Sequence, residues 1–348
     1  MQGKCGLFFT SYGKERGLFP SRFQRAALAL FAVALLALPQ VLGTYHVTIA
    51  NTVLVSVAAA ASLNLLTGFC GQISLGHAAF MGVGAYGAAN ALLAGAPFVA
   101  AVLFGGLCAA VVGMVFGIPS LRLKGIYLAI STMAAQLILS YLFLHWEGVT
   151  GGSSGLLLKP PSVLGYTFDT HEKRYYLFLA MTALCLLAVV NLARSRFGRA
   201  FVAIRDHHLS AEIAGVSLFR YKLYAFAASS FLAGVAGAML VHRTMKVSMD
   251  NFGFDMSIAY LAMIIIGGLG SVLGSVMGAV FMTLLPVVLG IGAAQLSGVF
   301  PDIVSQIAAL KEGIFGLVVI LFLIFEPEGL VHRWRLVRAY WKLYPFAH

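Results

Sequence analysis

Residues 26–66 read AALALFAVALLALPQVLGTYHVTIANTVLVSVAAAASLNLL, and no Asp, Glu, Lys or Arg appears anywhere from Ala26 to Leu121. The full chain has 348 residues, of which 60% are hydrophobic and 10% are charged. A soluble domain usually carries about 25% charged residues, because polar side chains must cover its surface. A bilayer removes that requirement, and a helix that crosses it needs roughly 20 apolar residues. The sequence therefore predicts an all-α integral membrane protein and not a soluble fold with a buried helical core.

Charged residues and helix-breaking Gly or Pro residues divide the apolar sequence into about ten segments, and this pattern predicts a polytopic helical bundle. The predicted membrane segments are 26–43, 47–66, 78–95, 98–118, 125–145, 175–193, 223–241, 257–268, 271–289 and 306–326. The segment at 257–268 is too short to cross a bilayer alone, so some helices are expected to be discontinuous or re-entrant. The transmembrane domain covers residues 26–326, between a basic arm at 1–25 and a basic tail at 327–348.

Basic residues predict which loops face the cytoplasm, since segments rich in Lys and Arg remain inside. They gather in the arm at 1–25, after the fourth segment, in the loop at 194–222 and in the tail at 327–348. Both termini are therefore expected in the cytoplasm. The loop at 146–174 is rich in Gly, Ser and Pro and is expected to be periplasmic. The first apolar run resembles a signal peptide, but Pro39 follows it without a clear small-x-small cleavage site, so we interpret it as an uncleaved helix.

The formal net charge of +11 comes from these short basic segments, as is typical of loops beside anionic lipid and not of a nucleic-acid surface. No H-E-x-x-H, G-x-S-x-G or Walker A motif is present, so no enzymatic activity is expected. We interpret His207 and His208 as solvated loop residues. The four cysteines form no C-x-x-C pair, and free thiols are expected at Cys5, Cys70, Cys108 and Cys185.

The membrane segments contain almost no ionisable residues, although ion-driven carriers usually need such residues as relays. The adjacent Lys311 and Glu312 lie near the start of the last segment, where we interpret them as an interfacial pair. The energy for transport is therefore expected from a partner that hydrolyses nucleotide. A passive channel also fits this pattern, and an ion-coupled carrier and a membrane scaffold are the remaining alternatives.

The first of three informative segments is residues 64–86, which read NLLTGFCGQISLGHAAFMGVGAY. Glycine permits both close helix approach and unwound backbone. Because irregular backbone in a membrane must avoid lipid, the segment predicts a discontinuous element that lines a cavity. Small-residue helix packing explains the same pattern equally well. The candidate translocation-path residues here are Asn64, Gly71, Gln72, Ser74, Gly76 and His77.

The second segment, residues 267–279, reads GGLGSVLGSVMGA and has the same small-residue composition. Transporters often place broken helices in corresponding positions of two halves. This pattern adds Gly268, Gly270 and Ser271 to the candidate translocation path. The third segment is the loop at 194–222, in which Leu209–Ala214 predicts a short helix that Gly215 ends. Such a helix suits contact with a cytoplasmic motor, although a merely solvated loop is the alternative.

Together these segments resemble the permease family of bacterial branched-chain amino-acid ABC importers, in particular its LivM-like subunits. The pattern G-x-x-G-Q-x-S-x-G-H-A-A-F-x-G-x-G-A-Y stands at Gly68–Tyr86, and A-I-R-(x)5-A-E-x-x-G stands at Ala203–Gly215. Gly267–Ser271 and the closing Pro327–Leu330 also match. The resemblance covers most of the chain from about residue 47 to residue 330.

The resemblance implies a multi-pass permease of the bacterial inner membrane. It also implies a second homologous permease subunit, two cytoplasmic ATPases and a periplasmic binding protein as partners. ATP and magnesium would bind those ATPases, and no cofactor is expected in this chain. The docking loop would use Arg205, Ala211, Glu212 and Gly215, although Leu209 stands where the general E-A-A-x-x-x-G pattern has Glu. Branched-chain amino acids are the expected substrates, with urea, short amides and other amino acids as alternatives.

Overall fold

A computed structural model describes residues 22–120, 123, 125–163, 165–296, 313–314, 316–322, 324–326 and 328–343. The arm at 1–21 lies outside these described residues. So do Cys5, Arg122, Lys124, Lys311, Glu312, Pro327 and residues 306–312 of the last predicted segment. The chain divides into two compact units, Met1–Thr48 and Ile49–His348.

The first unit contains helix α2 (Arg22–Val41) and the first turn of α3 (Thr44–Asn64). Helix α2 corresponds to the predicted segment at 26–43. Most of its described side chains are exposed, including the large apolar Leu30 and Phe31. Exposed apolar side chains on so hydrophobic a helix are suited to contact with lipid.

The second unit is a helical bundle with two short antiparallel strand pairs. Besides the rest of α3, its helices are η1 (Leu65–Phe69), α4 (His77–Leu93), α5 (Phe98–Ser120), α6 (Ile126–His145), α7 (Glu147–Thr150), α8 (His171–Arg194), α9 (Arg196–Asp206), α10 (His208–Ile213), α11 (Leu218–Thr244), η2 (Met249–Phe252), α12 (Phe254–Gly267), α13 (Val272–Leu296) and α15 (Leu330–Leu343). Strand β1 (Leu156–Leu157) pairs with β4 (Lys246–Val247), and β2 (Ser162–Val163) pairs with β3 (Tyr166–Thr167).

Among the described residues, 7 helices are long and apolar enough to cross a bilayer. They are Thr44–Phe69, Phe98–Pro119, Ile126–His145, His171–Arg194, Leu218–Thr244, Met249–Gly267 and Val272–Ile291. This finding confirms the predicted all-α, multi-spanning membrane fold. The predicted segment at 78–95 becomes α4, which has 17 residues and is mostly buried against other helices. It belongs to the protein core, although its composition alone resembles that of a lipid-facing helix.

The core of the second unit is formed where α4, α5 and α11 pack closely together through glycine. A Cβ atom on Gly84 would overlap the backbone of Gly234 on α11, and one on Gly237 would overlap the carbonyl of Met81. A Cβ atom on Gly105 of α5 would likewise meet the carbonyl of Gly84. These contacts require glycine, because any side chain would force the helices apart.

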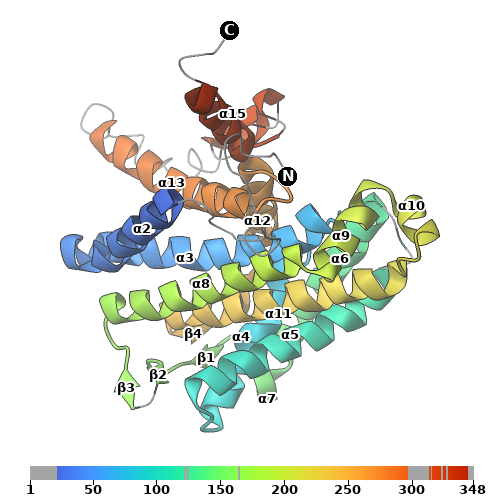
Figure 1. The fold of residues 1–348 in the computed structure, drawn as a ribbon. Coiled ribbons are helices and arrows are strands. Elements are labelled where there is room, and N and C mark those ends of the chain that lie inside the picture. Colours follow the sequence, from blue (N-terminus) through green and yellow to red (C-terminus); the bar gives the residue numbers. More distant parts are fainter. Residues whose placement is uncertain are drawn as a thin grey trace. The chain divides into compact units, whose positions relative to one another are not determined.

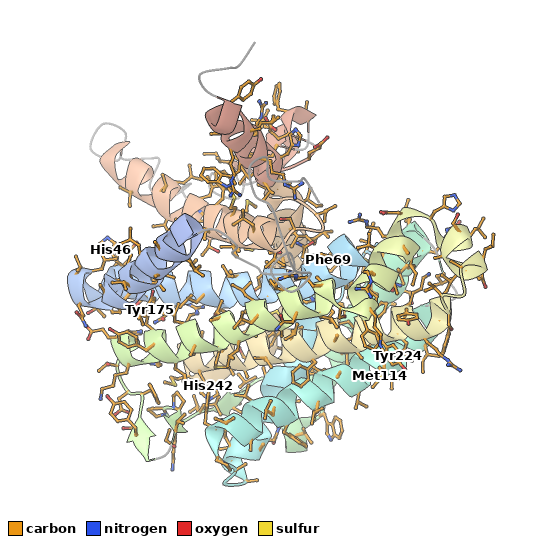
Figure 2. All side chains as sticks on the ribbon, viewed as in Figure 1. His46, Phe69, Met114, Tyr175, Tyr224 and His242 are labelled. Carbon is orange, nitrogen blue, oxygen red and sulfur yellow. The ribbon has the colours of Figure 1, made fainter. Side chains whose placement is uncertain are left out.

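The segments that connect the long helices differ between the two ends of the second unit (Figure 1). Helices α9 and α10 lie at one end of the bundle, and the strands with α7 lie at the other end. Figure 2 shows Tyr224 and His242 near opposite ends of α11, which connects the two. The loops at 146–174 and 194–222 therefore lie at opposite ends of the bundle. The assignment of one end to the cytoplasm stays a prediction.

Candidate functional site

The first glycine-rich segment contains a break between two helices. Helix α3 continues into the π-helix η1, residues 70–76 are not helical, and α4 begins at His77. Gly71 has a φ of +72°, a conformation that favours glycine. Both interpretations of the segment therefore apply, each to a different half. The π-helix η1 and the non-helical residues 70–76 together form the first break, whereas Gly84 serves close helix packing.

The second glycine-rich segment contains a similar break. Helix α12 ends at Gly267, α13 begins at Val272, and the two helices pack against each other. Gly268 has a φ of +118° and Gly270 has a φ of +72°. A single continuous helix across this region is therefore excluded, in agreement with the predicted break.

Asn64 joins the two breaks through its buried side-chain amide. Its Oδ1 accepts a hydrogen bond from the N–H of Gly270 at 2.9 Å. Its Nδ2 donates to the carbonyl oxygen of Ser271 at 2.9 Å and to Oγ of Ser275 at 2.7 Å. Backbone groups freed by a helix break need such partners away from water. The side chain of Asn64, at the end of α3 directly before the first break, thus satisfies the backbone of the second break.

Arg205, at the end of α9, lies where both breaks meet the α9–α10 segment. Its Nη1 donates a hydrogen bond to the carbonyl oxygen of Gly68 at 2.9 Å. Its Nε and Nη2 each lie 2.9 Å from Oδ1 of Asp206. A Cβ atom on Gly71 would lie 2.9 Å from Cγ of Arg205, and one on Gly270 would lie 2.6 Å from its Nη1. Glycine at both positions therefore makes room for this one arginine.

The remaining predicted docking residues differ from Arg205 in their exposure. Ala211 is buried, whereas Glu212 and Gly215 are exposed. Helix α10 covers His208–Ile213 and is followed by Gly215 at a φ of +83°, which matches the predicted short helix and its stop. Ile213 is 88% exposed, and Leu209 on the same short helix is 54% exposed, so α10 presents two large apolar side chains. Sequence reasoning missed Ile213, although an isoleucine beside Glu212 in a basic loop was the available signal.

Some polar side chains in and next to the first break have hydrogen-bond partners among the described residues, and others have none. His77 is buried, and its Nε2 lies 3.1 Å from both Oγ of Ser62 and the carbonyl oxygen of Ala59. By contrast, Oε1 of Gln72 and Oγ of Ser74 are buried and have no hydrogen-bond partner among the described residues. A buried polar atom without a partner is costly, so these two atoms are the stronger candidates for contact with a polar solute.

The N-terminus of α4 is capped by side chains that the sequence analysis did not single out. The N–H of Ala78 donates to Oγ of Ser257 at 2.9 Å, and the N–H of Ala79 donates to Oε1 of Gln136 at 2.9 Å. The N–H of Leu75 donates to Oγ1 of Thr132 at 2.9 Å. The isolated polar positions in otherwise apolar segments were the available signal. Because these groups already occupy the helix end, it is not an open site for a substrate charge.

Two arginines lie just beyond the predicted segments, at the end of the bundle that carries the strands. Arg174 is 7% exposed and donates to the carbonyl oxygens of Asp169 at 3.1 Å, His242 at 3.3 Å and Arg243 at 3.5 Å. It therefore satisfies the last carbonyls of α11. Arg243 donates to Oγ1 of Thr52 at 3.3 Å, while its Nε is buried without a partner among the described residues.

The described residues contain no group of His, Cys, Asp and Glu that could hold a metal ion, and Cys70, Cys108 and Cys185 are free. A membrane-spanning bundle with two linked helix breaks and a projecting helical segment at one end is the arrangement expected of a transport permease.

A family model described as the permease component of the branched-chain amino acid transport system matches residues 45–323, and the chain belongs to that family. Over 87% of its length it is 29% identical to the high-affinity branched-chain amino acid transport system permease protein LivM of Escherichia coli, of which it covers 74%. It is also 25% identical to the probable LivM of Methanocaldococcus jannaschii, over 70% of the chain and 72% of that relative. The autoinducer 2 import system permease protein LsrC of an Enterobacter species is 26% identical over 76% of the chain and 77% of that relative. As a permease of this family, the chain is a multi-pass membrane subunit without catalytic activity of its own.

Proposed function

We propose that this chain is the permease subunit of an ATP-driven importer of leucine, isoleucine and valine. It forms the translocation path together with a second homologous permease subunit. Two cytoplasmic ATPases bind ATP and magnesium, and a periplasmic binding protein delivers the amino acid. The relatives named LivM, which match most of the chain, support this choice of substrate.

The observation that carries the proposal is the contact of Arg205 with the first helix break. Helix α10 presents the exposed Ile213, which suits contact with an ATPase subunit. Arg205 lies in the last turn of α9, directly before α10, and its guanidinium donates a hydrogen bond to the carbonyl of Gly68. A movement of the α9–α10 segment is therefore applied directly to the backbone of the first break. Asn64 extends the same connection to the second break.

The first test is uptake of radiolabelled leucine and hydrolysis of ATP by the reconstituted transporter in proteoliposomes. We expect Arg205→Gln to lower leucine uptake at least about tenfold, because a hydrogen bond from a charged donor is worth about 1.5–3 kcal/mol. ATP hydrolysis should fall less than uptake, because the ATPases themselves are unchanged. Arg199→Gln is the matched control, since Arg199 is exposed on the same helix. Wild-type uptake by the Arg205→Gln variant would refute the coupling role.

The same preparation separates the proposal from other modes of transport. Uptake by this chain alone, without ATP or partner subunits, would identify a passive channel. Uptake that follows a proton or sodium gradient would identify an ion-coupled carrier. Loss of uptake on deletion of residues 209–215, with the chain still inserted in the membrane, is the outcome expected of a docking segment.

The identity of the substrate needs a separate experiment, because other relatives of this chain are permeases named for autoinducer 2 and for xylose. In importers of this kind the binding protein usually selects the solute. Calorimetry on the partner binding protein with leucine, isoleucine, valine, urea and acetamide compares the candidates directly. Tighter binding of urea or acetamide than of the three amino acids would contradict the proposed substrate while leaving ATP-driven import intact.

A further inference from the structure

The second helix break also contacts the C-terminal part of the chain. Gly329 has a φ of +76°, and a Cβ atom on it would lie 2.7 Å from Cα of Gly268. Val331, in the first turn of α15, is 4% exposed. This close backbone contact fixes the start of α15 against the break.

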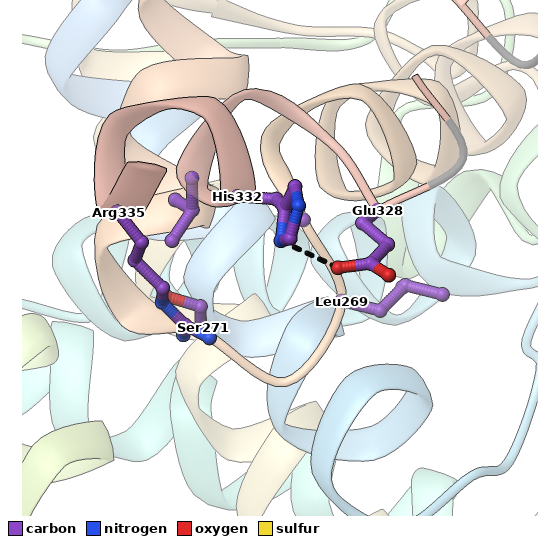
Figure 3. A pocket seen from close by; sticks show the side chains of 7 residues that line it. Leu269, Ser271, Glu328, His332 and Arg335 are labelled. Atoms are coloured by element: carbon purple, nitrogen blue, oxygen red, sulfur yellow. Dashed lines mark ion pairs between the residues drawn. The ribbon is translucent and has the colours of Figure 1, made fainter. Parts of the chain in front are cut away.

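A cavity of about 230 Å³ lies between the break and α15 (Figure 3). Its lining residues are Gly268, Leu269, Ser271, Glu328, Val331, His332 and Arg335. A site for one water needs roughly 10–15 Å³ on a comparable measure, so this cavity has room for a small organic molecule.

The cavity carries opposite charges at separate positions. Arg335 and Ser271 both line the cavity, and Figure 3 shows Glu328 and Leu269 on the opposite side of the view from Arg335. Arg335 makes no ion pair with another described residue. Glu328 uses Oε2 to contact Nδ1 of His332 at 2.5 Å, and its Oε1 makes no ion pair within the described part of the chain.

Neutral groups complete the lining. Oγ of Ser271 accepts a hydrogen bond from the N–H of Gly274 at 3.3 Å, so its hydroxyl hydrogen is free to be donated. Leu269 and Val331 supply branched aliphatic side chains to the same cavity. The cavity thus combines one cation, one anion, a hydroxyl donor and an apolar wall.

We propose that this cavity binds a free aliphatic α-amino acid as its zwitterion. The carboxylate pairs with Arg335 and accepts a hydrogen bond from Ser271, and the ammonium group pairs with Glu328. The side chain contacts Leu269 and Val331. Because Glu328 is 68% exposed, the affinity is expected to be weak. The choice of a branched aliphatic amino acid rests on the proposed function.

The position of this zwitterion site gives it a regulatory effect. A bound amino acid connects α15 to the second break, which Asn64 joins to the first break. The tail is the predicted cytoplasmic end, so the ligand is the released product of import. Its binding opposes movement at the break and lowers the rate of further import when the product accumulates.

The test measures binding of L-leucine by calorimetry to the purified full chain in lipid nanodiscs. Arg335→Gln and Glu328→Gln should each weaken binding about two- to fivefold, because both side chains are exposed and an exposed ion pair contributes up to about 1 kcal/mol. Arg338→Gln is the matched control, because Arg338 is exposed on the same helix and does not line the cavity. It should bind leucine as the wild type does.

Competition shows whether both charged groups of the ligand are recognised. 4-Methylpentanoate, which lacks the ammonium group, and 3-methylbutylamine, which lacks the carboxylate, should each compete about two- to fivefold more weakly than leucine. Equal competition by either compound would overturn the zwitterion site. Leucine binding of wild-type strength in both Arg335→Gln and Glu328→Gln, or none at millimolar leucine in the wild type, would do the same.

The two proposals can fail separately. Leucine binding that depends on Arg335 and Glu328, without ATP-driven leucine uptake by the reconstituted transporter, would overturn the importer proposal and retain the site. Leucine uptake without such binding would overturn the site and retain the importer. In the active transporter, leucine loaded into the compartment that receives it should slow uptake by the wild type and the Arg338→Gln variant.

Discussion

Replacement of Asn64 by leucine should separate the two helix breaks while keeping the side chain close to its present size. The wild-type amide makes three hydrogen bonds, to Gly270, Ser271 and Ser275. Such bonds between membrane helices average about 0.6 kcal/mol each, and up to about 1.7 kcal/mol. The variant also leaves the N–H of Gly270 without its partner. We therefore expect a loss of about 2–4 kcal/mol in unfolding free energy.

Asn64→Asp tests which of these bonds matter. The aspartate retains an acceptor for the N–H of Gly270 but loses both donors from Nδ2, so we expect it to keep about one third of the stabilisation. Asn191→Leu is the control for polarity, since Asn191 is exposed on α8. Thermal unfolding of the chain in nanodiscs gives the comparison, at about 2–4 °C per kcal/mol for a chain of about 150–250 residues and less for a longer one. Equal melting temperatures for Asn64→Leu and Asn191→Leu would refute the proposed link between the breaks.

Three further substitutions test separate contacts. Gly71→Ala should lower stability by about 1–3 kcal/mol and reduce uptake, because it combines backbone strain with a clash against Arg205. Gly95→Ala has similar strain but open space around it, so it should keep wild-type uptake. Equal uptake defects in the two variants would contradict this reasoning. Ile213→Ser should leave the melting temperature unchanged and weaken co-purification of the ATPase subunits at least about threefold. Unchanged co-purification would exclude Ile213 from the docking surface. Arg174→Gln should cost about 2–3 kcal/mol in thermal unfolding, since it uncaps the end of α11, and a neutral result would show that water replaces the guanidinium.

The membrane fold was predictable because charge composition alone decides it. The long uncharged stretch after Ala26 cannot form the surface of a soluble protein. The break at Gly267–Ser271 was also predictable from its glycines and the shortness of the preceding segment. The buried position of α4 was not predictable, because a helix in lipid and a helix among other helices have similar composition. Only the close contacts of Gly84 with neighbouring helices distinguish the two cases.

The candidate site was only partly accessible from the sequence. The loop motif drew attention to Arg205, but its position suggested contact with a partner. The side chain also reaches Gly68, which is 137 residues away in sequence, and no local pattern reports so distant a contact. The caps at Thr132, Gln136 and Ser257 were missed for the same reason. Isolated polar residues in apolar helices indicate that partners exist without showing which backbone groups they satisfy.

The π-helix η1 places an extra residue within the helical path that ends at the first break. A π-helical turn closes its hydrogen bonds one residue later than an α-helical turn does. Conversion of η1 to α-helix would therefore advance the register beyond it by one residue, which corresponds to a rotation of about 100° and a shift of about 1.5 Å. Gln72 would then face a different neighbour while Asn64 remained in place. Such a conversion would change the direction in which the residues after η1 face without unfolding α3.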